Sequence, residues 1–204
     1  MSLRVICKTK KDESKSWGCN RLRIIAGQRR GKQLVTPRDR SIRPTADRIR
    51  ESIFNIIADR VSDARVLDLF AGTGAMGIEA LSRGAAHATF VDSSIEAVAL
   101  VQRNLAACGF AERARVIRRA AVEALAGMTG GAGFDLVFMD PPYDRALVIP
   151  ALAALRAAAV TDPEVLIVVE HAPVETLPDQ KGGWRCLDQR RYGKTLVSFL
   201  GAVL

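Results

Sequence analysis

The residues best suited to chemistry are Asp140-Pro141-Pro142-Tyr143, which follow the apolar run 134–139. That run is typical of a buried strand. Each proline fixes φ at about −65° and lacks a backbone donor, so the segment should be stiff and extended. A carboxylate and an aromatic ring in fixed relation suit the binding of a flat, nitrogen-bearing group such as a nucleobase. The same residues also fit a plain strand and turn, with Tyr143 packed on the core.

A glycine-rich loop is the second feature with chemical meaning. Gly72, Gly74 and Gly77 form a Gly-x-Gly-x-x-Gly pattern between a predicted strand at 66–70 and a predicted helix at 75–83. Glycine permits a tight turn and lets a ligand approach the backbone closely. The strand–loop–helix context strengthens a signal that is weak by itself. We therefore expect a cofactor at this loop.

Two acidic residues indicate which cofactor this is. Asp68 lies just before the loop, and Asp92 ends the next predicted strand, 24 residues later (92 − 68). Asp92 can accept hydrogen bonds from both ribose hydroxyls, as in nicotinamide enzymes. Asp68 would repel a pyrophosphate but attract the amino and sulfonium groups of S-adenosylmethionine. The pair favours that cofactor over a nicotinamide. The plain alternative is a tight turn that Asp68 caps locally.

Positive charge is concentrated at the front of the chain. Residues 1–62 hold 16 of the 30 Lys and Arg and 6 of the 22 Asp and Glu, a balance of +10. Residues 63–204 hold 14 and 16, a balance of −2. A basic front end joined to a near-neutral body favours contact with a nucleic acid over a merely solvated surface.

The chain reads as a flexible segment and two structured parts. Residues 1–20 are polar and lysine-rich and should be flexible. Residues 21–62 are the basic part, with a predicted β-hairpin at 22–35 and a helix at 46–61. Residues 63–204 alternate strands and helices, which predicts a doubly wound, mostly parallel α/β sheet of seven strands ending in an antiparallel hairpin. The strands are expected at 66–70, 88–91, 115–118, 134–139, 165–169, 185–189 and 195–200, and the helices at 75–83, 95–108, 122–126 and 147–158.

Other classes of protein fit the sequence poorly. The four cysteines are scattered without a Cys-x-x-Cys pair, and His87 and His171 are the only histidines, so we expect reduced thiols and no metal site. No run of 18 apolar residues is present, and no secretory signal pattern is evident. We therefore expect a cytoplasmic protein.

Several motifs together resemble one family. The front end reads Arg23-Ile24-Ile25-Ala26-Gly27-x-x-x-Gly31, then Arg43-Pro44-Thr45-x-Asp47-x-x-Arg50-Glu51-x-x-Phe54-Asn55, and Arg191-Tyr192-Gly193 stands near the end. With the glycine loop and Asp140-Pro141-Pro142-Tyr143, this pattern over residues 21–204 resembles the RsmD family. That resemblance implies a Rossmann-like class I methyltransferase that uses S-adenosylmethionine to methylate N2 of one guanine in 16S ribosomal RNA, free or within a small-subunit particle.

The resemblance and the residues together give three sets of candidate site residues. The base site would consist of Asp140, Pro141, Pro142 and Tyr143. The cofactor site would consist of Asp68, Phe70, Ala71, Gly72, Thr73, Gly74, Asp92, Ser93 and Ala120. The RNA contacts would be Arg29, Arg30, Lys32, Arg38, Arg40 and Arg43. Arg48 and Arg50 fit RNA contact and simple helix-surface solvation equally well.

One departure and three rivals accompany this interpretation. Many methyltransferases carry an acid or asparagine after the third strand to contact the adenine amine, whereas Arg118-Arg119-Ala120-Ala121 offers none. Adenine would then be held by backbone amides near Ala120 and by apolar walls. The rivals are an adenine-N6 methyltransferase acting on DNA or RNA, a non-catalytic RNA-binding module with a methyltransferase fold, and a nicotinamide dehydrogenase.

Overall fold

The computed structural model describes residues 22–37, 44–128, 133–142, 145–175, 177 and 182–203. The predicted flexible segment at 1–20 lies outside them, as do Arg38, Arg40, Arg43 and Tyr143. Within the described residues, no helix has the length and apolar character needed to cross a membrane.

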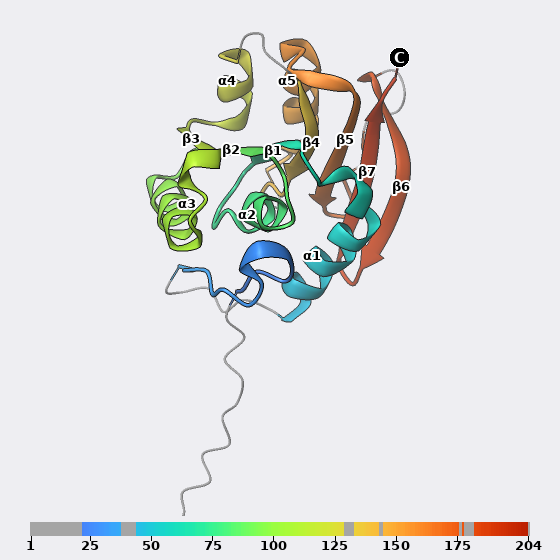
Figure 1. The fold of residues 1–204 in the computed structure, drawn as a ribbon. Helices are drawn as coiled ribbons and strands as arrows, with labels where there is room; N and C mark the ends of the chain where they lie inside the picture. Colours follow the sequence, from blue (N-terminus) through green and yellow to red (C-terminus); the bar gives the residue numbers. More distant parts are fainter. Residues whose placement is uncertain are drawn as a thin grey trace, which may run out of the picture.

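The described strands form the predicted seven-stranded sheet, and the structure shows their order to be β3-β2-β1-β4-β5-β7-β6 (Figure 1). The strands are β1 Arg65–Leu69, β2 His87–Asp92, β3 Ala114–Arg118, β4 Phe134–Met139, β5 Thr161–His171, β6 Trp184–Tyr192 and β7 Thr195–Ala202. Strands β1 to β5 are parallel to one another, whereas β7 pairs antiparallel with both β5 and β6. This arrangement is the predicted parallel sheet with a C-terminal antiparallel hairpin.

Helices cover both faces of the sheet (Figure 1). Helices α1 Pro44–Ile56, α2 Ala75–Ser82 and α3 Ile95–Cys108 pack on one face, and α4 Ala121–Ala126 and α5 Val148–Ala158 on the other. Strands at the centre of such a sheet are covered on both faces and are therefore mostly apolar. β1 and β4 follow this pattern and are buried along most of their length. Helix α1 ends before the predicted residue 61, and a separate 3-10 turn, Ala58–Arg60, follows it.

The predicted β-hairpin at 22–35 is wrong in form. Within residues 22–37, an isolated antiparallel bridge joins Arg23 to Gln33, and Gly27–Arg29 form a 3-10 helix. Beside this bridge, the N–H groups of Ile24 and Leu34 donate to the carbonyls of Lys32 and Leu22, both at 2.9 Å, whereas the N–H groups of Ile25 and Ala26 donate to the side-chain oxygens of Glu79, at 2.7 and 3.0 Å. The segment is therefore built onto helix α2.

Residues 22–37 share the core of the main body. Leu22, Ile24 and Leu34 are buried in the same cluster as the apolar faces of α1, α2 and α3. Gly27 has a φ of +80°, and a Cβ built there would lie 1.9 Å from the carbonyl oxygen of Ser82. The segment therefore meets α2 backbone to backbone, which glycine alone permits.

Candidate active site

The parallel strands bring the three predicted acids to one edge of the sheet. β1 lies between β2 and β4, and Asp68 pairs in register with Phe90 on one side and Phe138 on the other. Asp92 and Asp140 each stand two residues beyond those partners, at the carboxyl ends of their strands. In open α/β sheets, ligands bind at this edge.

The glycine-rich loop turns sharply between β1 and α2. Phe70 has a φ of +64°, and Gly72 and Gly74 have φ values of +54° and +77°. A positive φ at a non-glycine residue such as Phe70 is uncommon and strained. A Cβ at Gly72 would meet nothing nearer than the carbonyl oxygen of Phe70 at 4.0 Å. The backbone at Gly72 is therefore open to close approach by a ligand.

Asp68 is buried beneath this loop. Its Oδ2 accepts a hydrogen bond of 2.9 Å from the backbone N–H of Gly77, which lies in α2. Gly77 must lack a side chain, because a Cβ there would lie 2.4 Å from the ring of Phe90. Burial raises the pKa of Asp68 to about 7, with a smaller rise from the charge of Asp92, against the lowering effect of the Gly77 hydrogen bond. A cationic group above the loop would favour the ionised form of Asp68.

Asp92 braces the loop from the next strand. Its Oδ2 accepts from the N–H of Gly72 and its Oδ1 from the N–H of Ser94, both at 2.9 Å. Each carboxylate oxygen has capacity for a further hydrogen bond. Ser93, between these two contacts, is exposed. Asp92 is half-buried, so it is held in place by protein while still facing the open edge.

Asp140 follows β4 directly and is accessible to solvent. The surrounding protein still removes enough water to raise its pKa to about 8, and the negative charges of Glu170 and then Asp68 add to that rise. Pro141 is buried and Pro142 exposed. Tyr143 lies outside the described residues.

Around Ala120 the structure has backbone groups and the small side chains of Ala120 and Ala121. Ala120 is exposed and stands before α4, where its carbonyl accepts from the N–H of Ala124. The neighbouring Arg119 N–H donates to the carbonyl of Asp92, which ties this turn to the end of β2. Among the described residues, no group of three or more His, Cys, Asp and Glu is placed to hold a metal ion.

The described candidates for RNA contact differ from one another. Arg30 and Lys32 are exposed next to the 3-10 helix. Arg29 is exposed too, but its Nε donates to the carbonyl of Cys108 at 2.7 Å, at the last residue of α3. A cation at the C-terminal end of a helix is favourable, so Arg29 also anchors the segment.

Comparison with known proteins agrees with this geometry. The family model described as Conserved hypothetical protein 95 matches residues 22–201. Ribosomal RNA small subunit methyltransferase D of Escherichia coli K12 is 40% identical over 167 residues, which cover 82% of this chain and 83% of that protein. The protein of the same name from Haemophilus influenzae is 36% identical over 180 residues, with coverage of 87% and 91%.

The chain belongs to this methyltransferase D family. The membership expected from the sequence motifs is therefore confirmed. A solved structure of a candidate methyltransferase from Escherichia coli, yhhF, is 34% identical and matches with a TM-score of 0.78, covering 89% of this chain and 98% of that one. The methyltransferase fold predicted for the body is thus shared with that solved structure.

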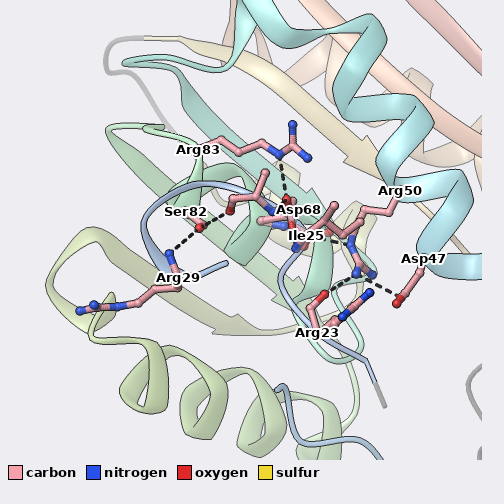
Figure 2. Close-up of polar contacts among 11 residues, drawn as sticks. Arg23, Ile25, Arg29, Asp47, Arg50, Asp68, Ser82 and Arg83 are labelled. Atoms are coloured by element: carbon pink, nitrogen blue, oxygen red, sulfur yellow. Dashed lines mark hydrogen bonds and ion pairs between the residues drawn. The ribbon is translucent and has the colours of Figure 1, made fainter. Parts of the chain in front are cut away.

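This member of the methyltransferase D family contains a buried ionic cluster that sequence reasoning missed. Arg50 is 4% exposed, so it is not the solvated helix-surface residue that the sequence allowed. Figure 2 shows it between Arg23, whose carbonyl accepts from its Nη2 at 2.6 Å, and Asp47, whose Oδ1 lies 3.2 Å from the same nitrogen. Glu79, fully buried, lies 3.9 Å from the Nε of Arg50 and accepts a 2.7 Å bond from Arg83.

The cluster joins α1, α2 and residues 22–37, segments that lie far apart in the sequence. Ile49, Ile53, Ile56 and Ile57 predict one buried face for the helix expected at 46–61; the first two and Ile57 are buried, Ile56 is exposed, and none of them gives a sign that Arg50 is buried too. A further sign could have been found in α2, where Glu79 lies in a run that is otherwise apolar or small. An acid in such a run needs a buried donor or cation.

Proposed function

We propose that this chain transfers the methyl group of S-adenosylmethionine to N2 of one guanine in 16S ribosomal RNA. The observation that carries this proposal is the placement of Asp68, Asp92 and Asp140 beside the glycine-rich loop at one sheet edge, in a chain of the methyltransferase D family. The acids suit a cofactor with cationic and ribose groups next to a base amine. The proposed substrate, RNA of the small ribosomal subunit, is inferred from the names of the relatives.

The residues present fit the cofactor. The open backbone at Gly72 accommodates a close ligand, and Asp92 has acceptor capacity for ribose hydroxyls. The buried carboxylate of Asp68 suits a nearby positive charge, which would offset the free energy of its burial. Phe70, Ala71, Thr73, Gly74 and Ser93 complete the proposed pocket, with backbone near Ala120 against the adenine.

Replacing Asp92 by Ala tests the cofactor assignment. We expect the dissociation constant of S-adenosylhomocysteine, measured by calorimetry, to rise about 10- to 100-fold, because charge-assisted hydrogen bonds to the ribose are lost. Asp59→Ala, at an exposed position of the 3-10 turn after α1, is the control and should leave the affinity unchanged. An unchanged affinity in Asp92→Ala would remove Asp92 from the cofactor site.

The bound cofactor supplies an electrophilic methyl group, and the chain must make a poor nucleophile attack it. The lone pair of guanine N2 is delocalised into the ring. We propose that the Asp140 carboxylate and the Pro141 carbonyl accept the two N2 hydrogens, which orients that lone pair towards the methyl group. On methylation N2 would lose one proton, which Asp140 would take up. Tyr143 is proposed to stack on the base.

The RNA is proposed to cross the basic front of the molecule, at Arg29, Arg30, Lys32, Arg38, Arg40 and Arg43. Replacing Arg30 and Lys32 together by Ala should weaken RNA binding and make the plot of log affinity against log salt shallower, by about 0.7–0.9 for each phosphate that is no longer neutralised. Arg185→Ala is the control, since Arg185 pairs with Gly201 near the amino ends of the parallel strands. Equal salt slopes in the three proteins would exclude Arg30 and Lys32 from the interface.

The identity of the methyl acceptor is tested by incubating the chain with radiolabelled S-adenosylmethionine and, in turn, small subunits, 16S RNA and duplex DNA. We expect label in small subunits or 16S RNA that lack the modification, and none in duplex DNA. Label in DNA would favour an adenine-N6 or other base methyltransferase. Binding of RNA with no affinity for the cofactor would favour a non-catalytic module.

A further inference from the structure

Asn104 connects the glycine-rich loop to residues 22–37. It lies on α3 and is fully buried. Its Oδ1 accepts from the backbone N–H of Val35 at 2.7 Å, and its Nδ2 donates to the carbonyls of Val35 at 3.0 Å and Thr73 at 2.9 Å. One side chain thus binds both backbone groups of Val35 and the backbone at the loop tip.

The orientation of this amide is fixed by its partners. The N–H of Val35 requires an oxygen opposite it, and the carbonyls of Val35 and Thr73 require the nitrogen and its two hydrogens. A flipped amide would place donor against donor and acceptor against acceptor. An aspartate in this position would direct an oxygen at two carbonyl oxygens. The site therefore selects asparagine.

The contact with Thr73 holds the most sharply bent part of the loop. Thr73 lies between Gly72 and Gly74, whose φ values are +54° and +77°. The N–H of Gly74 turns back to the carbonyl of Ala71 at 2.7 Å, and the N–H of Gly72 binds Asp92. Glycines that adopt such angles also adopt many others when nothing holds them. An anchor at the intervening carbonyl reduces that freedom.

The other end of the bridge lies in the segment proposed to meet RNA. Val35 follows the exposed residues Arg30 and Lys32, and its own side chain is exposed. Its two backbone groups have their side-chain partner on α3, the helix that begins shortly after Asp92. A shift of Val35 would therefore be transmitted to the carbonyl of Thr73 through one rigid amide.

We propose that Asn104 is a positioning residue that holds the glycine-rich loop in its cofactor-binding shape and couples that loop to residues 34–36. The proposal rests on the cofactor site assigned above and makes no use of the identity of the methyl acceptor. Because the coupling is a free energy, it acts in both directions: a ligand at the loop steadies residues 34–36, and a ligand on residues 34–36 steadies the loop.

The first test measures amide hydrogen exchange in the cofactor-free chain, with NMR as the method of detection. In Asn104→Leu, the amides of Gly72 and Gly74 should exchange at least about 5-fold faster, although neither is bonded to Asn104. The amides of the central strands β1 and β4 should exchange as in the parent chain. Gln102→Leu, at an exposed position of the same helix, is the control. Unchanged exchange at Gly72 and Gly74 would overturn the positioning role.

The second test measures coupling without RNA. S-adenosylhomocysteine should slow amide exchange at residues 34 and 36 in the parent chain and in Gln102→Leu, but not in Asn104→Leu. Its dissociation constant should rise about tenfold in that variant. A purely structural role would lower the melting temperature and leave the affinity and the ligand-induced protection intact, and that result would refute the proposal.

Asn104→Asp guards against a variant that does not fold. It keeps the acceptor for the Val35 N–H and the shape of the side chain, but it puts an oxygen in place of the nitrogen that donates to the carbonyls of Thr73 and Val35, so faster exchange at Gly74 is expected again. If S-adenosylhomocysteine does not bind even the parent chain, the proposed function fails at its cofactor. Exchange at Gly72 and Gly74 still decides whether Asn104 holds the loop.

Discussion

Replacing Asp140 by Asn is expected to lower kcat about 10²- to 10⁴-fold, the range typical of a group that positions and deprotonates a reacting amine. The change keeps the shape of the side chain but removes the charge and gives one end a donor. The affinity for S-adenosylhomocysteine should stay within about threefold of the parent value, since Asp140 is proposed to contact the base and not the cofactor. Single-turnover kinetics with saturating cofactor would measure the chemical step.

The control for this prediction is Asp59→Asn, an exposed acid on the 3-10 turn after α1. It should leave both kcat and cofactor affinity unchanged. Near-normal turnover in Asp140→Asn with intact cofactor binding would show that Asp140 does not act on the base.

The raised pKa of Asp140 has two consequences with definite signs. If the ionised carboxylate accepts the hydrogens of N2, kcat/KM should rise with pH up to about 8. Since the charge of Glu170 contributes to the raised pKa, Glu170→Gln should move this rise to lower pH. A pH profile that is the same in the parent chain and in Glu170→Gln would contradict this electrostatic account.

Stability should respond in the opposite sense to activity. The pKa of Asp140 is higher in the folded chain than in the unfolded one, so the folded chain binds this proton more tightly. The contribution of this proton to the free energy of unfolding is therefore fully present below pH 4 and is lost as pH rises through about 8. Asp140→Asn should therefore raise the melting temperature at pH 8 and leave it unchanged near pH 4. Because Asp140 is accessible to water, the rise should be modest.

Replacing Gly27 by Ala is expected to cause the second large effect, a loss of about 3–5 kcal/mol in the free energy of unfolding. The new Cβ would lie 1.9 Å from the carbonyl oxygen of Ser82, so residues 22–37 must move away from α2. Glu79 would then lose the N–H groups of Ile25 and Ala26 while its charge stays buried. Urea denaturation measures the loss, and limited proteolysis locates it in residues 22–37.

Gly31 offers a matched control. Its φ of +82° nearly equals the +80° of Gly27, but a Cβ there would meet nothing within 4 Å. Gly31→Ala should therefore show the backbone strain alone, about 1–2 kcal/mol. Similar losses in the two variants would mean that contact with Ser82 contributes little to docking the segment.

The sheet and its edge could be predicted because their determinants are local and repeated. The apolar run 134–139 predicts the bounds of β4, and the predicted helix 95–108 matches α3, whose ends Ser94 and Gly109 cap in the structure. Because β2, β1 and β4 are parallel neighbours in the sheet, Asp68, Asp92 and Asp140 gather at the edge where these strands end. These predictions needed no knowledge of distant contacts.

The structure of residues 22–37 could not be predicted in the same way, because its determinants lie far away in the sequence. Alternation at 22–35 is compatible with a hairpin, but it gives no sign that the N–H groups of Ile25 and Ala26 donate to Glu79, more than fifty residues away. In the sequence Arg50 resembles any helix-surface arginine, and only the structure shows its contacts with the carbonyl of Arg23 and with Glu79. Asn104 has no local signal either, since its partners are Val35 and Thr73. Sequence periodicity does not encode partners of this kind.

The most direct measurement of the central claim is the identity of the modified nucleoside. Small subunits that lack the modification would be incubated with the chain and labelled S-adenosylmethionine, and the RNA digested and analysed by mass spectrometry. The account predicts N2-methylguanosine at one position of 16S RNA with the parent chain and almost none with Asp140→Asn. Methyl-labelled adenosine, or equal labelling by Asp140→Asn, would contradict it.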